Sequence, residues 1–324
     1  TPAADFLGPL GLSANEWDKV TDVLDVWFDS GTTHAFALRE RGIIDPETGQ
    51  ANLYMEGSDQ HRGWFQSSLL ECCATRGMAP YKQVLTHGFT MASDGRKMSK
   101  SLGNKVDPLK VMEQTGADII RLWALSVDFT EDHRIGDEII KGVGDQYRKL
   151  RNTFRYLLGA LDGFVGDMGD AGEIPELEVY VLAMLADLDG KLRHAAENYD
   201  FNAYTRLLVD FCNEDLSAFY FDIRKDALYC DPLNSTRRRA CRTVMDALFS
   251  RLTLWLAPIL CFTMEEVWQA RHGDALGSVH MQEFLAAPED WRDDTLAAHM
   301  SAVQTFRDGV NEAAEPLRKD GIIK

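Results

Sequence analysis

The sequence predicts an α/β part up to about residue 137, followed by an all-α part. Two observations support this division. In the first part, short apolar runs rich in strand-forming residues alternate with helical segments. From Glu138 to Arg271, segments with helical periodicity replace the strands. The fold class predicted is therefore α/β plus all-α, with a small open sheet joined to a helical bundle.

The α/β part is predicted from a strand, helix and strand in succession. Leu53–Met55 and Val84–Thr86 are short apolar runs bounded by Gly and polar residues, as in buried strands. Residues 61–76 between them suit a helix that Gly77 ends and Pro80 cannot continue. This spacing indicates a βαβ unit of a parallel sheet.

The chain then passes through a Gly/Ser/Lys-rich loop into helices. Asp107 and Pro108 suit the N-cap and first position of a helix. Four longer helical segments are expected, at about 138–161, 177–198, 202–227 and 235–270. In the third, an apolar stripe at steps of three to five residues is typical of bundle core, formed by Leu207, Leu208, Phe211, Leu216, Phe219 and Tyr220. Pro258 is expected to kink the fourth.

Composition excludes several classes of protein. The 324 residues suffice for two domains, and 45% hydrophobic with 26% charged residues is ordinary for a globular chain. The longest apolar run, Leu252–Phe262, is too short for a membrane span, and no secretory leader pattern opens the chain. The net charge of −17 argues against a simple nucleic-acid coat but allows a local basic face.

The cysteines and the chain ends give two further expectations. Six cysteines without a CxxC pair or zinc spacing suggest reduced thiols in a cytoplasmic protein, and no zinc is expected. The chain opens on Thr1 without Met and stops at Lys324 partway through an apparent element, so we expect a piece of a longer protein.

The segment Glu56–Phe65 is the first that suggests chemistry. It lies where a predicted parallel strand ends and a helix begins, which is where open α/β sheets bind ligands. Gly57 permits close backbone approach, Asp59 and Gln60 suit ribose hydroxyls or an amino group, and Glu56 accepts hydrogen bonds. The alternative is that Asp59 caps the helix and Trp64 is core.

The segment Asp94–Asn104 is the second. Lys97 and Lys100, three residues apart among small residues, form a cationic loop suited to charge on a leaving pyrophosphate. The spacing is not that of a Walker loop. A solvated charged turn is the alternative for such a stretch.

At this point the sequence resembles a known family. Lys97–Ser101 (Lys-Met-Ser-Lys-Ser) matches the signature loop of class I aminoacyl-tRNA synthetases. With Asp25–Gly31, Glu56–Phe65 and His87–Phe89, the chain resembles the isoleucyl-tRNA synthetases. The resemblance continues into the helical part through Gly116–Trp123, Arg151–Thr153 and Ala257–Leu260. Valyl, leucyl and methionyl relatives share the Lys-Ser loop and remain alternatives, whereas residues 57–65 point to isoleucine.

The resemblance implies a domain order and a reaction. Residues 1–137 correspond to the C-terminal half of a Rossmann-like catalytic domain with its stem, 138–271 to a helical anticodon-binding domain, and 272–324 to the start of a C-terminal extension. The implied reaction is ATP-dependent formation of isoleucyl-adenylate and transfer of isoleucine to tRNA(Ile), with Mg²⁺ accompanying ATP. A monomer without membrane association is expected.

The resemblance also assigns roles to particular residues. By this likeness, Glu56 contacts the adenylate, Gly57, Asp59 and Gln60 line its ribose and amino-acid side, and His87 lies beside the adenosine. Trp27 and Trp64 wall the isoleucine pocket. Lys100 binds ATP and stabilises the departing pyrophosphate, with Lys97 supporting the same charge and Met98 in the same ATP-binding loop.

Two basic clusters are candidate tRNA contacts. One lies at the start of the helical part and one opens its last long helix: Lys141, Arg148, Lys149, Arg151 and Arg155, and Arg237, Arg238, Arg239 and Arg242. For any single arginine, an exposed salt bridge is the alternative.

The sequence also departs from the family pattern. The HIGH tetrapeptide is absent, the inserted editing domain would precede residue 1, and the cysteine-rich zinc module is missing. We therefore expect the chain to be inactive alone. Two alternatives remain: a tRNA-anticodon-binding module with an inert half-site, and a helical scaffold with an incidental loop.

Overall fold

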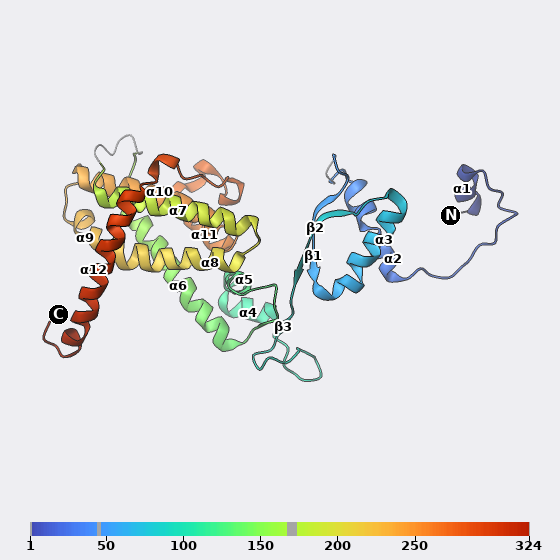
Figure 1. Ribbon diagram of the computed structural model, residues 1–324, viewed down its shortest axis with the longest axis horizontal. Helices are drawn as coiled ribbons and strands as arrows, with labels where there is room; N and C mark the ends of the chain where they lie inside the picture. Colours follow the sequence, from blue (N-terminus) through green and yellow to red (C-terminus); the bar gives the residue numbers. More distant parts are fainter. Residues whose placement is uncertain (1, 44–46, 167–173, 324) are drawn as a thin grey trace. The chain divides into compact units, whose positions relative to one another are not determined.

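The computed structural model describes residues 2–43, 47–166 and 174–323, and the chain divides into two compact units. The first comprises Thr1–Phe89 with Thr130–Asp132, and the second Thr90–Phe129 with His133–Lys324 (Figure 1). Strands β1 and β2 belong to the first unit, and the long helices belong to the second. Both predicted structural classes are therefore present.

The first unit contains the predicted βαβ arrangement. Strands β1 and β2 pair in parallel, from Ala51 opposite Tyr81 to Gly57 opposite His87, and α3 connects them. In chain order its elements are α1 (Ala3–Leu7), the 3₁₀ turn η1 (Gly8–Leu10), α2 (Val26–Gly31), the π-helical η2 (His34–Arg39), β1 (Ala51–Gly57), the 3₁₀ turn η3 (Ser58–Arg62), α3 (Trp64–Arg76) and β2 (Tyr81–His87).

The helix between the strands begins later than predicted. Residues 58–62 form a 3₁₀ turn, and Gly63, with φ −137° and ψ −117°, separates this turn from α3. The C-terminal prediction is confirmed, since Gly77 takes the left-handed conformation at φ 71°. Tyr54 of β1 and Phe65 of α3 form the centre of a small core.

The second unit is mainly helical. Its elements are β3 (Thr90–Met91), α4 (Pro108–Thr115), α5 (Ala117–Ser126), β4 (His133–Arg134), α6 (Asp137–Ala160), α7 (Glu176–Glu197), α8 (Phe201–Asp210), the π-helix η5 (Phe211–Tyr220), α9 (Phe221–Tyr229), α10 (Thr236–Leu256), α11 (Cys261–His272), the 3₁₀ turns η6 (Gly273–Leu276), η7 (Val279–Met281) and η8 (Glu289–Trp291), and α12 (Asp294–Lys319). Asp107 caps α4 as predicted, accepting from the Leu109 amide at 3.0 Å.

The apolar stripe predicted between 202 and 227 is bundle core. Leu208, Phe211, Leu216 and Tyr220 are each at most 4% exposed. The segment is not a uniform α-helix, because a ten-residue π-helix joins α8 to α9. Within the described ranges, no helix combines the length and apolar character needed to cross a membrane.

The prediction of one kinked helix over 235–270 is wrong, since the helix breaks completely. α10 ends at Leu256 and α11 begins at Cys261, with Pro258 in the break. Helix α5 stabilises the break with two side chains. Arg121 donates to the carbonyls of Pro258 and Ile259 at 2.7 and 3.1 Å.

The second of these side chains is the buried Asp118. Its carboxylate accepts from the amides of Phe262 and Thr263 at 3.3 and 2.8 Å, and from the Thr263 hydroxyl at 2.6 Å. Backbone groups that a broken helix leaves unpaired are thus satisfied from another element.

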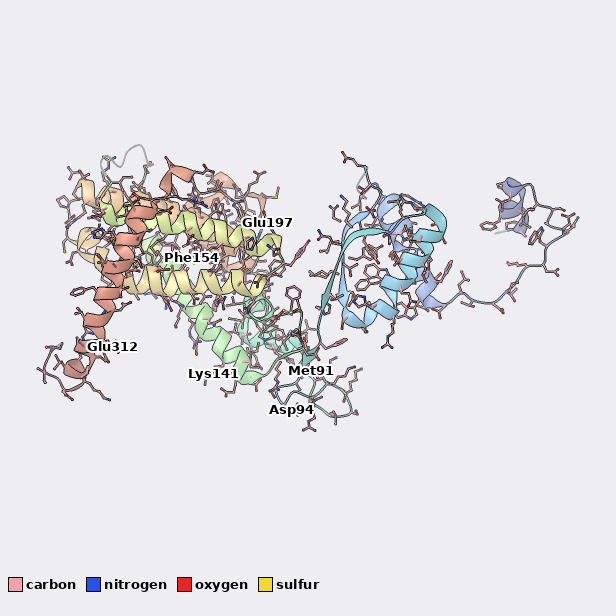
Figure 2. All side chains as sticks on the ribbon, in the orientation of Figure 1. Met91, Asp94, Lys141, Phe154, Glu197 and Glu312 are labelled. Atoms are coloured by element: carbon pink, nitrogen blue, oxygen red, sulfur yellow. The ribbon has the colours of Figure 1, made fainter. Side chains whose placement is uncertain are left out.

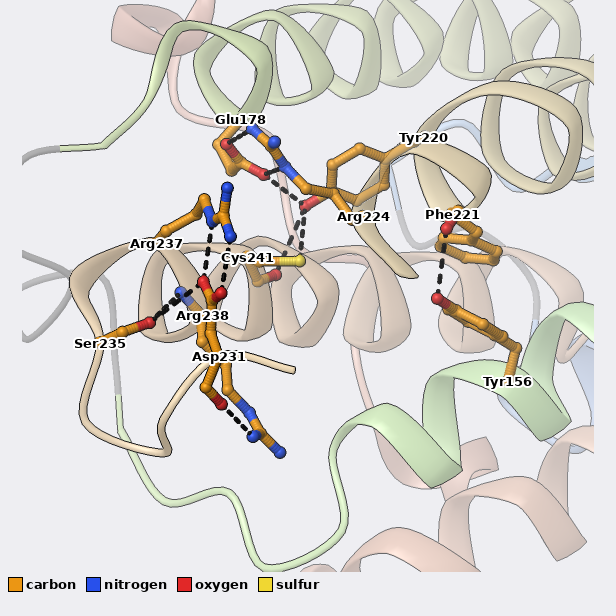
Figure 3. Close-up of polar contacts among 10 residues, drawn as sticks. All are labelled: Tyr156, Glu178, Tyr220, Phe221, Arg224, Asp231, Ser235, Arg237, Arg238 and Cys241. Atoms are coloured by element: carbon orange, nitrogen blue, oxygen red, sulfur yellow. Dashed lines mark hydrogen bonds and ion pairs between the residues drawn. The ribbon is translucent and has the colours of Figure 1, made fainter. Parts of the chain in front are cut away.

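A buried ion pair joins α7 to α9. Glu178 is fully buried and accepts two hydrogen bonds from Arg224 at 2.5 Å, while the Tyr220 hydroxyl donates to it at 3.2 Å (Figure 3). Beside them, burial raises the pKa of the Cys241 thiol to about 12, so this thiol stays protonated at neutral pH. Loss of either charged partner would leave the other buried and uncompensated.

Candidate functional site

The carboxyl ends of β1 and β2 bring Glu56, Gly57 and His87 together. The parallel register places Gly57 opposite His87, and the His87 Nε2 lies 3.7 Å from Glu56 Oε1. His87 Nδ1 donates to the Gly88 carbonyl at 2.9 Å, which fixes the ring. A polar cluster therefore lies at the sheet edge where the sequence predicts ligand binding.

Gly57 is necessary for the local shape of this cluster. A Cβ atom there would lie 2.8 Å from Asp59 Oδ1 and 3.6 Å from His87 Cε1. Because Gly57 has no side chain, the Asp59 carboxylate can lie against the end of β1. Glu56 accepts the Gly57 amide at 3.0 Å and keeps half of its side chain exposed.

Asp59 does not cap the helix, contrary to the alternative considered from sequence. Neither η3 nor the N-cap Gly63 of α3 has a side-chain cap bond, and Gln60 instead accepts from the Trp64 amide at 3.0 Å. Asp59 is exposed. The oxygen of Gln60 is thus engaged by the protein, and its amide nitrogen is the group left to donate to a ligand.

Trp27 and Trp64 both lie near the start of α3, but their surroundings differ. Trp64 stacks on Tyr54 with ring centroids 4.3 Å apart, and its Nε1 donates to Ser30 O and Thr33 Oγ1. Trp27 is 46% exposed and packs close to Gly63, where an added Cβ would lie 3.2 Å from its ring. Trp64 belongs partly to the core, and Trp27 presents the more open surface.

The lysine loop lies in the second unit and is organised by its own polar residues. Met91 and Asp94, labelled in Figure 2, mark its beginning. Hydrogen bonds led by the Arg96 backbone amide lower the pKa of Asp94. Asn104 then closes the loop, accepting from the Ser99 amide at 2.9 Å and donating to the Lys97 carbonyl at 3.3 Å.

The two lysines are exposed, while Met98 faces inward. The Lys100 side chain has no hydrogen bond or ion pair with any residue in the described part of the chain, while the Lys100 carbonyl accepts from the Gly103 amide at 3.3 Å. Met98 packs against the helical core, and its sulfur accepts from the Val106 amide at 3.4 Å. Met98 therefore anchors the loop from which Lys97 and Lys100 project.

The predicted site residues thus fall into both units. Glu56, Gly57, Asp59, Gln60, His87, Trp27 and Trp64 lie in the first, and Lys97, Met98 and Lys100 lie in the second. Across residues 2–43, 47–166 and 174–323, no three His, Cys, Asp or Glu side chains are grouped as a metal site requires.

The first basic cluster lies along α6. Lys141, Arg148 and Arg155 follow one another at seven-residue steps, two helical turns apart, on one exposed stripe. Lys149 and Arg151 flank it and are also exposed. Arg148 is paired with Asp145, whereas Arg155 has no polar partner among the described residues.

Most arginines of the second basic cluster already have hydrogen-bond partners within the protein. Arg237 forms two bonds to the Asp231 carboxylate at 2.6 and 2.7 Å, and Arg238 donates to the Asp231 carbonyl at 2.7 Å (Figure 3). Arg239 is exposed and engaged in a polar interaction. Arg242 is 8% exposed and donates to the Asp162 carbonyl just past the end of α6, so it supports the fold.

A groove of about 600 Å³ lies between α6 and the α9–α10 turn. Besides two predicted cations, Arg155 and Arg238, it is lined by Asn152, Tyr156 and Tyr229, which the sequence did not single out as site residues. The only available signal was Asn152, which lies within the family-like Arg151–Thr153 stretch.

Two family models match the chain. Residues 3–136 match a model described as tRNA synthetases class I (I, L, M and V), and residues 178–324 match the anticodon-binding domain of tRNA ligase. The chain is 54% identical over 314 residues to an isoleucine–tRNA ligase of Zymomonas mobilis, and 50% identical over 321 residues to one of Caulobacter vibrioides. These matches cover 95% and 98% of this chain, but 33% and 32% of those proteins.

Solved structures confirm the fold class. A LeuRS of Agrobacterium radiobacter K84, in a ternary complex with tRNA and LeuAMS, superposes with a TM-score of 0.66 at 18% identity, covering 85% of this chain and 34% of that one. A methionyl-tRNA synthetase of Mycobacterium tuberculosis with methionyl-adenylate gives 0.55 at 24% identity, covering 68% and 44%. The chain thus spans about a third of the length of its curated relatives.

Proposed function

Because this chain belongs to the class I tRNA synthetases of the isoleucine, leucine, methionine and valine group, we propose that it forms part of an isoleucine–tRNA ligase. Its share is the half of the active site that carries the Lys97–Ser101 loop, together with the helical part that holds tRNA(Ile). The observation that carries this proposal is Lys100, exposed on a loop that Met98 and Asn104 hold in place.

In the first proposed step, an oxygen of the isoleucine carboxylate attacks the α-phosphorus of ATP. The bond to the β-phosphate bridging oxygen breaks, and pyrophosphate leaves with its electron pair. Lys100, supported by Lys97, meets the charge that develops on this group. Mg²⁺ bound to the triphosphate supplies further neutralisation of charge.

In the second step, a hydroxyl of the terminal tRNA ribose attacks the acyl carbon. The bond from this carbon to the phosphate oxygen breaks, and AMP leaves with the electron pair while the hydroxyl gives up its proton to the leaving phosphate. We assign adenylate contacts to Glu56, Gly57 and Asp59, and a donated hydrogen bond to the Gln60 amide. His87, fixed through its Nδ1, lies beside the adenosine. Trp27 and Trp64 form the apolar wall for the isoleucine side chain.

We further propose the division predicted from sequence, with a catalytic and stem part at 1–137, an anticodon-binding part at 138–271 and the start of an extension at 272–324. The exposed cations of α6 support tRNA binding best, because the α10 cluster is mostly engaged by Asp231 and Asp162. The working state proposed is a monomer that binds isoleucine, ATP and tRNA(Ile).

Isoleucine-dependent ATP–pyrophosphate exchange tests the proposal. The chain would be assayed alone and mixed with a separately produced N-terminal part of a related isoleucine–tRNA ligase. We expect exchange only in the mixture, and a loss of about 100-fold with Lys100→Ala, the usual effect of removing one transition-state donor. Lys105→Ala, exposed outside the signature pentapeptide, is the matched control.

Three outcomes would contradict the proposal. Exchange that prefers valine, leucine or methionine would move the chain to a sister enzyme. Exchange by the chain alone would show that its half-site is complete. A silent mixture that still binds tRNA would favour the second candidate, a tRNA-binding module without activation chemistry, which the exposed α6 cations favour.

A further inference from the structure

Trp64 is held in place through both its backbone and its ring. Its amide donates to Gln60 Oε1 at 3.0 Å, and its indole Nε1 donates to the Ser30 carbonyl at 3.1 Å and to the Thr33 hydroxyl at 3.0 Å. Tyr54 covers one face of the indole, with ring centroids 4.3 Å apart and ring planes 5° from parallel. Contacts within the first unit therefore determine both the position and the rotation of this ring.

Thr33 is the side chain that accepts the indole proton. A hydroxyl has one proton to donate and two lone pairs that accept. The Thr33 hydroxyl donates to the Ser30 carbonyl at 3.0 Å, so its oxygen is available to accept from the indole. Thr33 stands at the N-cap position of η2, where threonine commonly caps, but its side chain forms no cap bond there. The hydroxyl thus serves Trp64 instead of the start of η2.

The same contact links the two side chains assigned to the isoleucine pocket. Trp27 lies on α2, and Thr33 follows closely after the end of that helix. At the start of α3, a Cβ atom on Gly63 would lie 3.2 Å from the Trp27 ring. Because α2 approaches the start of α3 this closely, the bond from Trp64 to Thr33 positions one tryptophan relative to the other.

An aliphatic substrate makes the position of this wall decisive. An aliphatic side chain forms no hydrogen bonds, so a pocket recognises it through close contact alone. A gap of about 0.5–1 Å already removes about a quarter to a half of the dispersion attraction between two surfaces. A small rotation of the indole would therefore weaken contact with the one methylene group that isoleucine has and valine lacks.

We propose that Thr33 is a positioning residue that sets the preference of the site for isoleucine over valine. It acts through Trp64, whose indole it holds against Tyr54, and not by contact with the substrate. The inference rests on the proposed function, in which the substrate is isoleucine.

Three substitutions test the role of the Thr33 hydroxyl. Thr33→Val removes the hydroxyl and keeps the β-branched shape, whereas Thr33→Ser keeps the hydroxyl. Thr75→Val is the matched control, since the Thr75 hydroxyl also donates to a backbone carbonyl, that of Glu71 at 2.7 Å. Thr75 lies about three turns further along α3 than Trp64, so this control removes the same kind of bond away from the tryptophans.

The first measurement is pyrophosphate exchange by the mixture with the N-terminal part, with circular dichroism as a check on folding. The preference is the ratio of kcat/KM for isoleucine to kcat/KM for valine. We expect Thr33→Val to lower this ratio about fourfold, the value of one buried methylene group, through a higher KM for isoleucine and with the KM for ATP unchanged. Thr33→Ser should restore the ratio, and Thr75→Val should leave it unchanged.

The second measurement is the nuclear magnetic resonance signal of the Trp64 indole N–H, which needs no catalysis. The chain would carry isotope-labelled tryptophan, and the loss of one signal in Trp64→Phe would assign it. We expect the proton of this group to exchange slowly with solvent in the wild type. Thr33→Val should shift the signal and speed the exchange, and Thr75→Val should do neither.

An unchanged isoleucine-to-valine ratio in a folded Thr33→Val variant would overturn the proposal, as would an unchanged indole signal. It would also be overturned if Thr33→Val raised the KM values for ATP and isoleucine equally, because Thr33 would then only support the fold. Failure of the proposed function is distinguishable, since the wild-type mixture would then show no exchange with isoleucine, while the indole signal would still test the contact between Thr33 and Trp64.

Discussion

Replacing Asp118 with alanine tests how α5 holds the break between α10 and α11. The buried carboxylate accepts hydrogen bonds from the Phe262 amide and from the amide and hydroxyl of Thr263. The two amides belong to the first turn of α11, which has no other N-cap side chain. Alanine would leave the amide and hydroxyl of Thr263, a residue only 7% exposed, without this partner.

The expected cost follows from those contacts. A buried donor left without a partner costs about 1–3 kcal/mol, and loss of an N-cap typically costs about 1 kcal/mol. The bond from the Thr263 amide is counted at its full value. The long bond from the Phe262 amide and the bond from the Thr263 hydroxyl are counted in part, so the free energy of unfolding should fall by about 3 kcal/mol. For a unit of this size that corresponds to a Tm lower by about 6–12 °C.

Urea and thermal unfolding, followed by far-ultraviolet circular dichroism, measure this loss. Thr263→Val is the matched control, because it removes the hydroxyl while keeping the shape and the Thr263 amide bond, at a cost of about 1 kcal/mol. If Asp118→Ala destabilised the protein no more than Thr263→Val does, the carboxylate would not be what secures the start of α11.

Two further predictions concern a carboxyl group and a glycine. Burial, with acidic neighbours, raises the pKa of Asp215 from 3.8 to about 6, so the folded state binds this proton more tightly and the unfolding free energy should fall as pH rises from about 4 to above 6. Because Asp215 is partly exposed, solvent screening reduces this effect, and urea titrations should show that Asp215→Asn removes about 1–2 kcal/mol of the decline in unfolding free energy. An equal decline in the wild type and the variant would contradict this origin. A Cβ at Gly88 would lie 2.3 Å from the Glu131 backbone, so Gly88→Ala should destabilise the first unit and lower exchange activity in the two-part mixture, while Gly8→Ala, in open space, should change neither. Full pyrophosphate-exchange activity and unchanged amide hydrogen exchange in Gly88→Ala would show that the close approach of Gly88 to the Glu131 backbone is dispensable.

The local features of the fold were predictable because neighbouring residues determine them. The two strands, their connecting helix, the Asp107 cap and the Gly77 terminus all follow from patterns within a few residues. The break at Pro258 depends on Asp118 and Arg121, more than 130 residues away, and no local pattern records such partners.

The candidate site was predictable to a similar extent. The sequence located the Lys97–Ser101 loop and the strand end at Glu56, because both are local motifs. It did not distinguish exposed arginines from buried ones, so Arg242 was grouped with surface cations although it bonds the backbone past α6. The groove also escaped prediction, since α6 and α9 form it only after packing.

The π-helix between α8 and α9 determines which way the side chains of α9 face. A π turn takes up more residues than an α turn, and each additional residue rotates the downstream helix by about 100° relative to the upstream one. Because of this offset, Arg224 meets Glu178 and Tyr229 borders the groove. Single-residue deletions within Phe211–Tyr220 would therefore disturb contacts well beyond this segment, although none of the deleted residues takes part in them.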